Sequence, residues 1–334
     1  MRPPHRLSST PAVEATAPCI LDLGGGVLAG FDAAVWPAEP ISVGVALDRR
    51  AHCRVETRPS GLRVESKDTL EKLEVETVAE LPMVGVGGLV RRALAAVGAE
   101  SGLNVVTQAR VPTSAGLWSE TALAIAVAAA AARALGRVVA PHEWPGLAHG
   151  PGRIEAGAVI GAQVSVWGGV AAVPLSAAGP RAAERLRVDP ARIEECLLLV
   201  DPGAPSEAPA SRGEGEARAV LAEVAAGALR VRDALVAGAF SQVAGLLAAE
   251  HQAWRRLGLV AGGGPVEAIV RVALAAGGAA RACGTNPRSL VLVWAEPGER
   301  RDGPREAVTA ALKAAGHRTF PCRLDLRGLE VEEA

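Results

Sequence analysis

The 334-residue chain can form one large domain or two of ordinary size, and it is long enough to bury a substantial core. Its formal net charge of -1 offers no electrostatic case for nucleic acid or an anionic membrane as a partner. The five cysteines are scattered and form no CxxC pair, which predicts reduced core thiols in a cytoplasmic protein, with neither disulfides nor a zinc site.

The first third of the chain is predicted to be rich in β-strands. Residues 1–18 are mostly polar and proline-rich and are expected to form a loose tail. A short apolar strand then runs into the three glycines of residues 24–26. The further elements expected are strands at residues 41–47 and 73–78, a hairpin of residues 51–57 with 61–66, a helix at 89–97 and a strand at 103–111.

A long alanine-rich helix is expected to begin at Ser119, whose hydroxyl is a good N-cap. Residues 112–116 are rich in turn formers, so the start of this helix is expected to be presented rather than buried in a preceding element. A helix start carries unpaired N–H groups and a partial positive charge, which together favour phosphate binding. This segment therefore predicts an anion site.

The second half alternates strands with helices, a pattern typical of an α+β sandwich. Residues 176–192 combine proline, glycine and mixed charge, and they mark the best boundary between two domains, placed at 19–180 and 181–334. The elements expected after it are strands at residues 196–200, 289–294 and 319–326, and helices at 214–236, 239–257, 265–276 and 306–315.

Three stretches together resemble the GHMP superfamily of small-molecule kinases, nearest to its bacterial heptose-phosphate kinase branch. Residues 112–120 read P-T-S-A-G-L-W-S-E, where the family has P-x-x-x-G-L-G-S-S. Residues 155–169 are similar to its E…G-x-Q-D-Q…G-G segment, and residues 197–294 follow the order of its C-terminal domain. The resemblance implies a two-domain α+β fold, with a ribosomal-S5-domain-2-like βα domain that holds ATP and a ferredoxin-like C-terminal α/β sandwich.

The resemblance also implies roles for single residues, because phosphoryl transfer depends on positioning the phosphates and neutralising their charge. The implied nucleotide contacts are Gly116, Leu117, Trp118, Ser119, Glu120 and Gly284. The implied acceptor contacts are Gly25, Gly26, Asp32 and Gln163. ATP and Mg²⁺ are the cofactors of an active member, with Ser119 and Glu155 as the implied Mg²⁺ ligands. Without the family match, Ser119 is a plain N-cap and Glu155 an exposed carboxylate paired with Arg153 or solvent.

Several of these positions depart from the family pattern. Trp118 stands where backbone must approach the phosphates closely, and Glu120 replaces the second serine. A carboxylate in the first helical turn is stabilised by the helix dipole, and it would repel a triphosphate unless a metal bridged the two. Val164 occupies the position of the catalytic aspartate, and a valine can neither accept a proton nor orient a hydroxyl.

Two more motifs are eroded. The glycine-rich third motif keeps only Gly284, and Val27 with Leu28 replace the Thr-Asp pair that the family uses on the sugar. Our hypothesis is a kinase fold whose ATP phosphoryl transfer is impaired or lost, acting through a sugar-like ligand or a protein partner. The alternative is an active ATP-dependent kinase of a sugar or sugar phosphate.

A different class of function has some support near the N-terminus. Residues 20–26 read I-L-D-L-G-G-G, and Asp48 follows a second apolar strand, like the glycine loop and ribose contact of a Rossmann-type methyltransferase or dehydrogenase. The intervening residues are short and broken by prolines, which disfavours the crossover helix that such a fold requires. A parallel sheet around Gly24 would support this second alternative.

Overall fold

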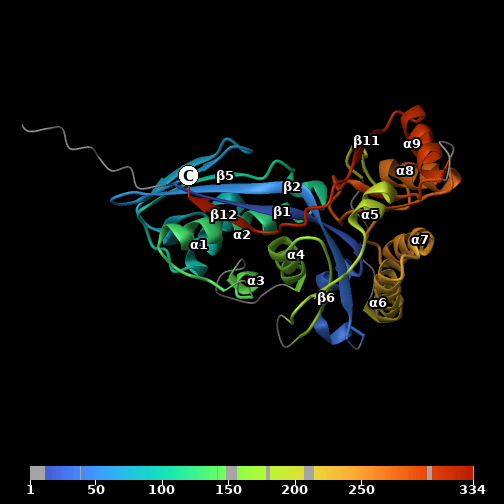
Figure 1. Ribbon diagram of the computed structural model, residues 1–334, viewed down its shortest axis with the longest axis horizontal. Coiled ribbons are helices and arrows are strands. Elements are labelled where there is room, and N and C mark those ends of the chain that lie inside the picture. Colours follow the sequence, from blue (N-terminus) through green and yellow to red (C-terminus); the bar gives the residue numbers. More distant parts are fainter. Residues whose placement is uncertain are drawn as a thin grey trace, which may run out of the picture.

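The computed structural model describes residues 12–37, 39–140, 142–147, 156–177, 181–206, 214–298 and 303–333. These residues form two sheets, a larger mixed one and a four-stranded antiparallel one, which lie at opposite ends of an elongated molecule (Figure 1). Helices pack on both sheets, so the architecture is the α+β arrangement predicted from the sequence. No helix in the part of the chain described has both the length and the hydropathy to cross a membrane.

The larger sheet has the strand order β12-β1-β2-β5-β3-β4, with β6 and β7 attached to β2. Its strands are β1 (Val13–Gly24), β2 (Ile41–Thr57), β3 (Leu62–Ser66), β4 (Lys72–Val75), β5 (Leu103–Gln108), β6 (Val170–Pro174), β7 (Glu184–Arg185) and β12 (Glu330–Glu333). The long β2 pairs through its first part with β6 and through its last part with β5. One strand thus continues through both parts of the sheet.

The structure differs from the sequence expectation in this sheet. The strands predicted at residues 41–47 and 51–57 are one continuous strand, and residues 13–18, assigned to a tail, belong to β1. The predicted hairpin is wrong, because β5 lies between β2 and β3. Gly102 separates the two ends of the expected turn: its carbonyl accepts from the Arg58 N–H at 2.8 Å, and its own N–H donates to the Gly61 carbonyl at 2.6 Å.

Helices pack against the larger sheet (Figure 1). They are α1 (Gly85–Ala96), α2 (Ser119–Ala134) and α4 (Ala156–Trp167), while the short α3 (Trp144–Leu147) packs on α2 and α4. Short 3₁₀ helices lie at Gly26–Gly30, Ala33–Val35, Val78–Glu80 and Thr113–Ala115. The alanines of α2 from Ala122 to Ala132 are all buried, because their small side chains let the helix lie close to β1 and β2. The helix predicted to begin at Ser119 is therefore buried against the larger sheet.

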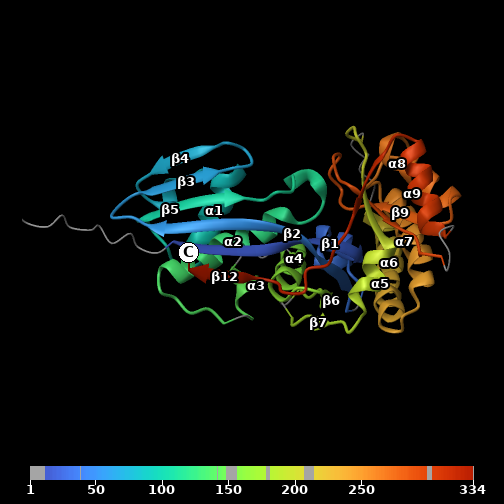
Figure 2. The same cartoon turned by 45° about the horizontal axis from the view of Figure 1, so that its top comes forward.

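The smaller sheet has the order β11-β8-β10-β9. Its elements are β8 (Leu197–Asp201), β9 (Ala279–Ala282), β10 (Val291–Trp294), β11 (Arg318–Pro321), α5 (Pro190–Cys196), α6 (Glu214–Val236), α7 (Phe240–Arg256), α8 (Gly264–Ala275) and α9 (Pro304–Ala314). Both faces are covered, since Leu199 and Leu198 of β8 belong to different hydrophobic clusters. After β11 the chain returns to the larger sheet, where β12 pairs with β1 (Figure 2).

Candidate functional site

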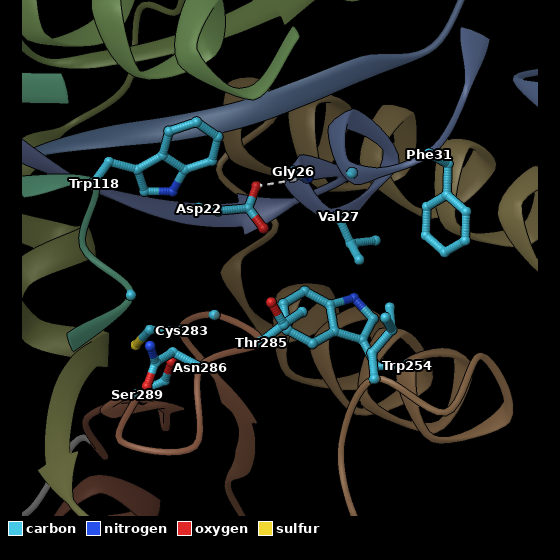
Figure 3. Close-up of a pocket in the computed structure, with 14 residues that line it drawn as sticks. Asp22, Gly26, Val27, Phe31, Trp118, Trp254, Cys283, Thr285, Asn286 and Ser289 are labelled. Atoms are coloured by element: carbon cyan, nitrogen blue, oxygen red, sulfur yellow. Dashed lines mark hydrogen bonds between the residues drawn. The ribbon is translucent and has the colours of Figure 1, made fainter. Parts of the chain in front are cut away.

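A cavity of about 530 Å³ lies between two layers of the molecule, the larger sheet with its helices and the smaller sheet with its helices. It is walled by the end of β1 with the loop after it, the turn before α2, the end of α7, and the loop between β9 and β10. In Figure 3, Trp118 and Asp22 stand on one wall, and Trp254 with Thr285 stands on the other. The lining residues are Asp22, Gly26, Val27, Gly30, Phe31, Gly116, Trp118, Trp254, Leu259, Cys283, Gly284, Thr285, Asn286 and Ser289.

Trp118 is the N-cap residue of α2 and has a left-handed backbone, with φ 52° and ψ 32°. The N-cap role predicted for Ser119 is therefore wrong, because Ser119 already lies inside the helix and its hydroxyl donates to the Pro112 carbonyl. The left-handed region is uncommon for a residue with a side chain and suits glycine, the residue that the resembling family has here. The indole packs against α4, where a Cβ added to Gly161 would lie 2.7 Å from Trp118 Cε3. Gly161 therefore makes the room that the ring needs at the cavity wall.

The turn before α2 touches the loop between β9 and β10 directly. The Leu290 N–H donates to the Ala115 carbonyl at 3.0 Å. Gly116 has φ 76°, and a Cβ built on it would lie 2.7 Å from the Gly284 nitrogen. Only glycine fits so close a backbone contact, and the contact brings Gly116 and Gly284 together at the same cavity.

Three other implied nucleotide contacts do not line this cavity. Leu117 is fully buried, and its carbonyl accepts from the Ile20 N–H at 2.9 Å. The Ser119 hydroxyl is also buried and donates to the Pro112 carbonyl at 3.5 Å. Glu120 is exposed in the first turn of α2, where its carboxylate favours the positive end of the helix dipole.

The implied acceptor contacts are divided in the same way. Gly26 lines the cavity, and Gly25 stands beside it with φ 84°. Asp32 is exposed and accepts from the Ala34 N–H at 2.8 Å as the N-cap of a 3₁₀ helix. Gln163 is bonded at both ends of its amide to the backbone of residues 181–183, at 2.8 and 2.7 Å. Its hydrogen-bonding groups hold that segment in place.

The family resemblance places the base at Val164 and the metal ligands at Ser119 and Glu155. Val164 is fully buried in the core, and a Cβ on Gly44 would lie 2.9 Å from its Cγ2. The implied metal ligand Glu155 lies outside the described residues. Within the described ranges, no group of three His, Cys, Asp or Glu side chains could hold a metal ion. The Ser119 hydroxyl is directed to a backbone carbonyl, so these residues alone do not assemble a Mg²⁺ site.

Asp22 is a functional-site residue that the sequence reasoning missed. Its Oδ1 accepts hydrogen bonds from the N–H groups of Gly24 and Gly26, at 3.2 and 2.9 Å, and from Ser42 Oγ at 3.1 Å. Its Oδ2 lies 3.0 Å from Nη2 of Arg281. The carboxylate therefore fixes the glycine-rich loop and one end of the cavity.

Arg281 and Glu250 complete a buried charge cluster with Asp22. Arg281 has no exposed surface; its Nη2 donates to the Asp22 carbonyl at 2.7 Å, and its guanidinium carbon lies 4.5 Å from the Trp254 ring centroid. Oε1 of Glu250 accepts from the Gly25 N–H at 3.1 Å and from Trp254 Nε1 at 3.2 Å. Burial raises the pKa of Glu250 to about 7, against the opposing attraction of Arg281.

A sequence signal for this cluster existed. Asp22 lies in the apolar run I-L-D-L, and Arg281 lies in A-A-R-A-C. A charge in a short apolar strand is costly to bury unless it is paired, so two such strands with opposite charges point to each other.

No family model and no curated protein matches the sequence. A D-glycero-D-manno-heptose 1-phosphate kinase from Bacteroides thetaiotaomicron has a similar structure, with a TM-score of 0.73 at 15% identity over 96% of this chain and 99% of that one. Lactococcus lactis galactokinase gives 0.71 at 13% identity over 97% and 95%, and a homoserine kinase from Cytophaga hutchinsonii gives 0.63 at 14% over 98% and 99%. The chain has the fold of the GHMP kinases.

The GHMP kinase fold confirms the two-domain α+β architecture expected from the order of the motifs. It also makes the Rossmann alternative wrong, because β1 pairs antiparallel with β2, the strand that follows it. A dinucleotide fold would need a helix and a parallel strand at this point. Gly24 instead ends β1, Gly25 is the N-cap of a 3₁₀ helix, and Gly26 begins that helix at the cavity.

The lining of the cavity carries little charge. Among the described lining residues, Asp22 is the one charged side chain, and there is no Lys, Arg or His. Burial raises the pKa of the Cys283 thiol well above its usual range, so Cys283 adds no charge to the lining. The cavity therefore offers a phosphate chain no cationic side chain from the part of the protein described.

Proposed function

We propose that this GHMP-kinase-like protein binds an uncharged, sugar-like molecule in the cavity and that its ATP phosphoryl transfer is impaired or lost. The observation that carries the proposal is Trp118 at the N-cap of α2, where an indole lines the cavity at the helix start. Phosphates bind a helix start through close backbone N–H contacts, and a ring at this position restricts that approach.

Electrostatics supports the same conclusion. Asp22 is the charged group of the described lining and is already paired with Arg281, so this lining presents no unpaired positive charge that would attract phosphate oxygens. Val164, at the position of the family's base, is packed in the core and can take no proton from an acceptor hydroxyl. Phosphoryl transfer relies on neutralising charge and positioning the nucleophile, and the residues described provide little for either task.

The cavity suits an uncharged ligand of small-molecule size. Its volume of about 530 Å³ falls within the common range for such sites. Its lining combines the apolar side chains of Val27, Phe31 and Leu259 with the polar side chains of Asn286 and Ser289. The structure of the galactokinase neighbour was determined with galactose, which supports a sugar as the ligand class.

Calorimetry and a turnover assay test this proposal together. ATP·Mg²⁺ and uncharged hexoses and heptoses are titrated separately into the protein, and ADP release is followed with each sugar and its phosphate. We expect binding of an uncharged sugar without micromolar binding of ATP and without ADP release. Micromolar ATP·Mg²⁺ binding with turnover on any of these acceptors would refute it. If none of these ligands binds, a protein partner becomes the better candidate for the cleft.

An active sugar or sugar phosphate kinase is the second candidate, and one observation favours it. Gly116 and Gly284 still meet at the start of α2, so the backbone of a phosphate loop is retained. In this case ATP and Mg²⁺ are the cofactors, and Glu155, which lies outside the described residues, is a metal ligand that the family resemblance implies. Turnover that requires Mg²⁺ and disappears in Glu155→Gln would favour this candidate.

A further inference from the structure

The two layers of the molecule are joined by charged groups buried between them. Glu250 on α7 accepts from the Gly25 N–H, 3.1 Å away on the loop after β1. Arg281 on β9 lies 3.0 Å from Asp22 on β1. Both contacts connect the smaller sheet and its helices to the end of a strand in the larger sheet, and Asp22 and Trp254 extend them to the cavity (Figure 3). The cluster is therefore placed to control how the layers meet at the cleft.

The cluster holds two carboxylates and one guanidinium, and Glu250 is the less well compensated carboxylate. Glu250 Oε2 lies 3.9 Å from Arg281 Nε, beyond hydrogen-bond length, and Nε has no hydrogen-bond partner among the described residues. Asp22 has the shorter ion pair and three further donors. An ionised Glu250 thus leaves about one net negative charge in a buried site, which is costly.

The other groups around Glu250 do not supply this missing charge. On the α6 side the neighbours are apolar, with Ala228 and Val231 packed on the glycine loop. The Cys283 thiol, just after β9, interacts with Arg281 and Asp22 and is kept neutral by burial.

A separate ionisable pair lies next to the cluster on α7 and α8. His251 Nε2 is 2.7 Å from Glu267 Oε1, and Arg255 Nε is 3.6 Å from the same oxygen. Burial lowers the pKa of His251, so it is neutral at physiological pH. All three groups belong to helices of the smaller sheet, and separating Gly25 from Glu250 leaves their contacts intact.

We propose that the Glu250 contact is a proton-controlled latch of the cleft: proton uptake holds the glycine loop against α7, and proton release opens that contact to water. Opening lets water solvate the carboxylate, and the open form therefore has the lower proton affinity. A conformation that binds fewer protons is favoured as the pH rises. The latch does not depend on which ligand the cavity accepts.

Hydrogen exchange of the Gly25 amide measures the latch directly. Between the ordinary pKa of 4.5 and the buried value of about 7, opening releases one proton. After correction for the intrinsic exchange rate, opening of the Gly25 amide should therefore increase by about tenfold per pH unit and level off above pH 7. The amide of Ala46, which donates to Gly169, reports exchange through global unfolding, which also exposes Glu250 and shares this pH dependence. A latch that opens locally therefore requires the Gly25 amide to open more often than the Ala46 amide across this range, and equal opening of the two amides would overturn the proposal.

Two variants identify the group responsible. In Glu250→Gln the slope should disappear, since the amide keeps the shape of the carboxyl without titrating. Glu223→Gln removes an exposed carboxylate of the neighbouring α6 and should retain the wild-type slope. A wild-type Gly25 amide without this slope would overturn the proposal even if Glu250→Gln did not fold. A slope that persists in folded Glu250→Gln would overturn it as well.

Discussion

Arg281 Nη2 lies 3.0 Å from Asp22 Oδ2, and this ion pair joins β9 of the smaller sheet to β1 of the larger one. Both side chains are almost completely buried, and the same Nη2 also donates to the Asp22 carbonyl. An ion pair of this kind is costly to break on one side, because the remaining charge stays in the core.

Replacement of Arg281 by methionine should destabilise the protein strongly. Asp22 and Glu250 would then share a buried site without a cation, and we expect a loss of about 3–5 kcal/mol in the free energy of unfolding. Urea denaturation measures the loss. Arg192→Met is the matched control, since its pair with Glu195 is about half exposed and should cost less than about 1 kcal/mol. Equal losses in the two variants would contradict a buried, cleft-spanning role for Arg281.

Substitution of Trp118 by glycine should open the start of α2. Glycine adopts the left-handed backbone of this position freely, and removal of the indole exposes the helix N–H groups to the cavity. We expect affinity for ATP·Mg²⁺ to rise at least about tenfold, which is about 1.4 kcal/mol in binding free energy. Calorimetry is run on Trp118→Gly, which removes the side chain, and on Trp118→Phe, which keeps an aromatic ring but removes the indole. Unchanged affinity in both would show that Trp118 is not what limits nucleotide binding.

A Cβ at Gly116 should disturb the contact between the two loops. In Gly116→Ala the new methyl group would lie 2.7 Å from the Gly284 nitrogen, in addition to the cost of φ 76°. Gly136→Ala is the control, because Gly136 has φ 68° with nothing within 4 Å of its added Cβ. The control should lose about 1–2 kcal/mol from the backbone alone. Thermal unfolding should show a clearly larger loss in Gly116→Ala, and equal losses would mean that the loops separate easily.

The unfolding free energy should depend on pH through Glu250. Its pKa is raised on folding from 4.5 to about 7, so the folded state binds more protons in this range and stability falls as the pH rises from 4.5 to 7. The contribution is on the order of 3 kcal/mol. His251 acts in the opposite direction: its lowered folded pKa removes stability as the pH falls below 6.5. Urea titrations of Glu250→Gln across this range should keep only the His251 effect. A pH profile identical to the wild type would contradict the assignment.

Two buried serines should respond differently to alanine. Ser289 Oγ lines the cavity region and has no hydrogen-bond partner among the described residues, so Ser289→Ala should leave stability nearly unchanged. Ser42 Oγ donates to Asp22 at 3.1 Å, and Ser42→Ala should cost about 1–3 kcal/mol. If a sugar binds, Ser289→Ala should weaken that binding. A large stability loss in Ser289→Ala would show that its hydroxyl has a structural role.

The sequence alone determined the central features of the part of the chain that is built on the larger sheet. The alanine content and the turn residues before Ser119 predicted α2 and the turn before it, because these preferences act between neighbouring residues. The order of the motifs indicated the two-domain fold, and two of the residues it singled out, Gly116 and Gly284, line the cavity.

Only the tertiary structure decided which distant segments meet. The placement of β5 between β2 and β3, the return of β12 to β1, and the cluster of Asp22, Glu250 and Arg281 join residues far apart in the chain. Gly25 and Glu250 are 225 positions apart, and Asp22 and Arg281 are 259 apart. Local propensity carries no information about such pairs. They form because a charge or a backbone hydrogen-bonding group that is buried in the core is costly unless it finds a partner there.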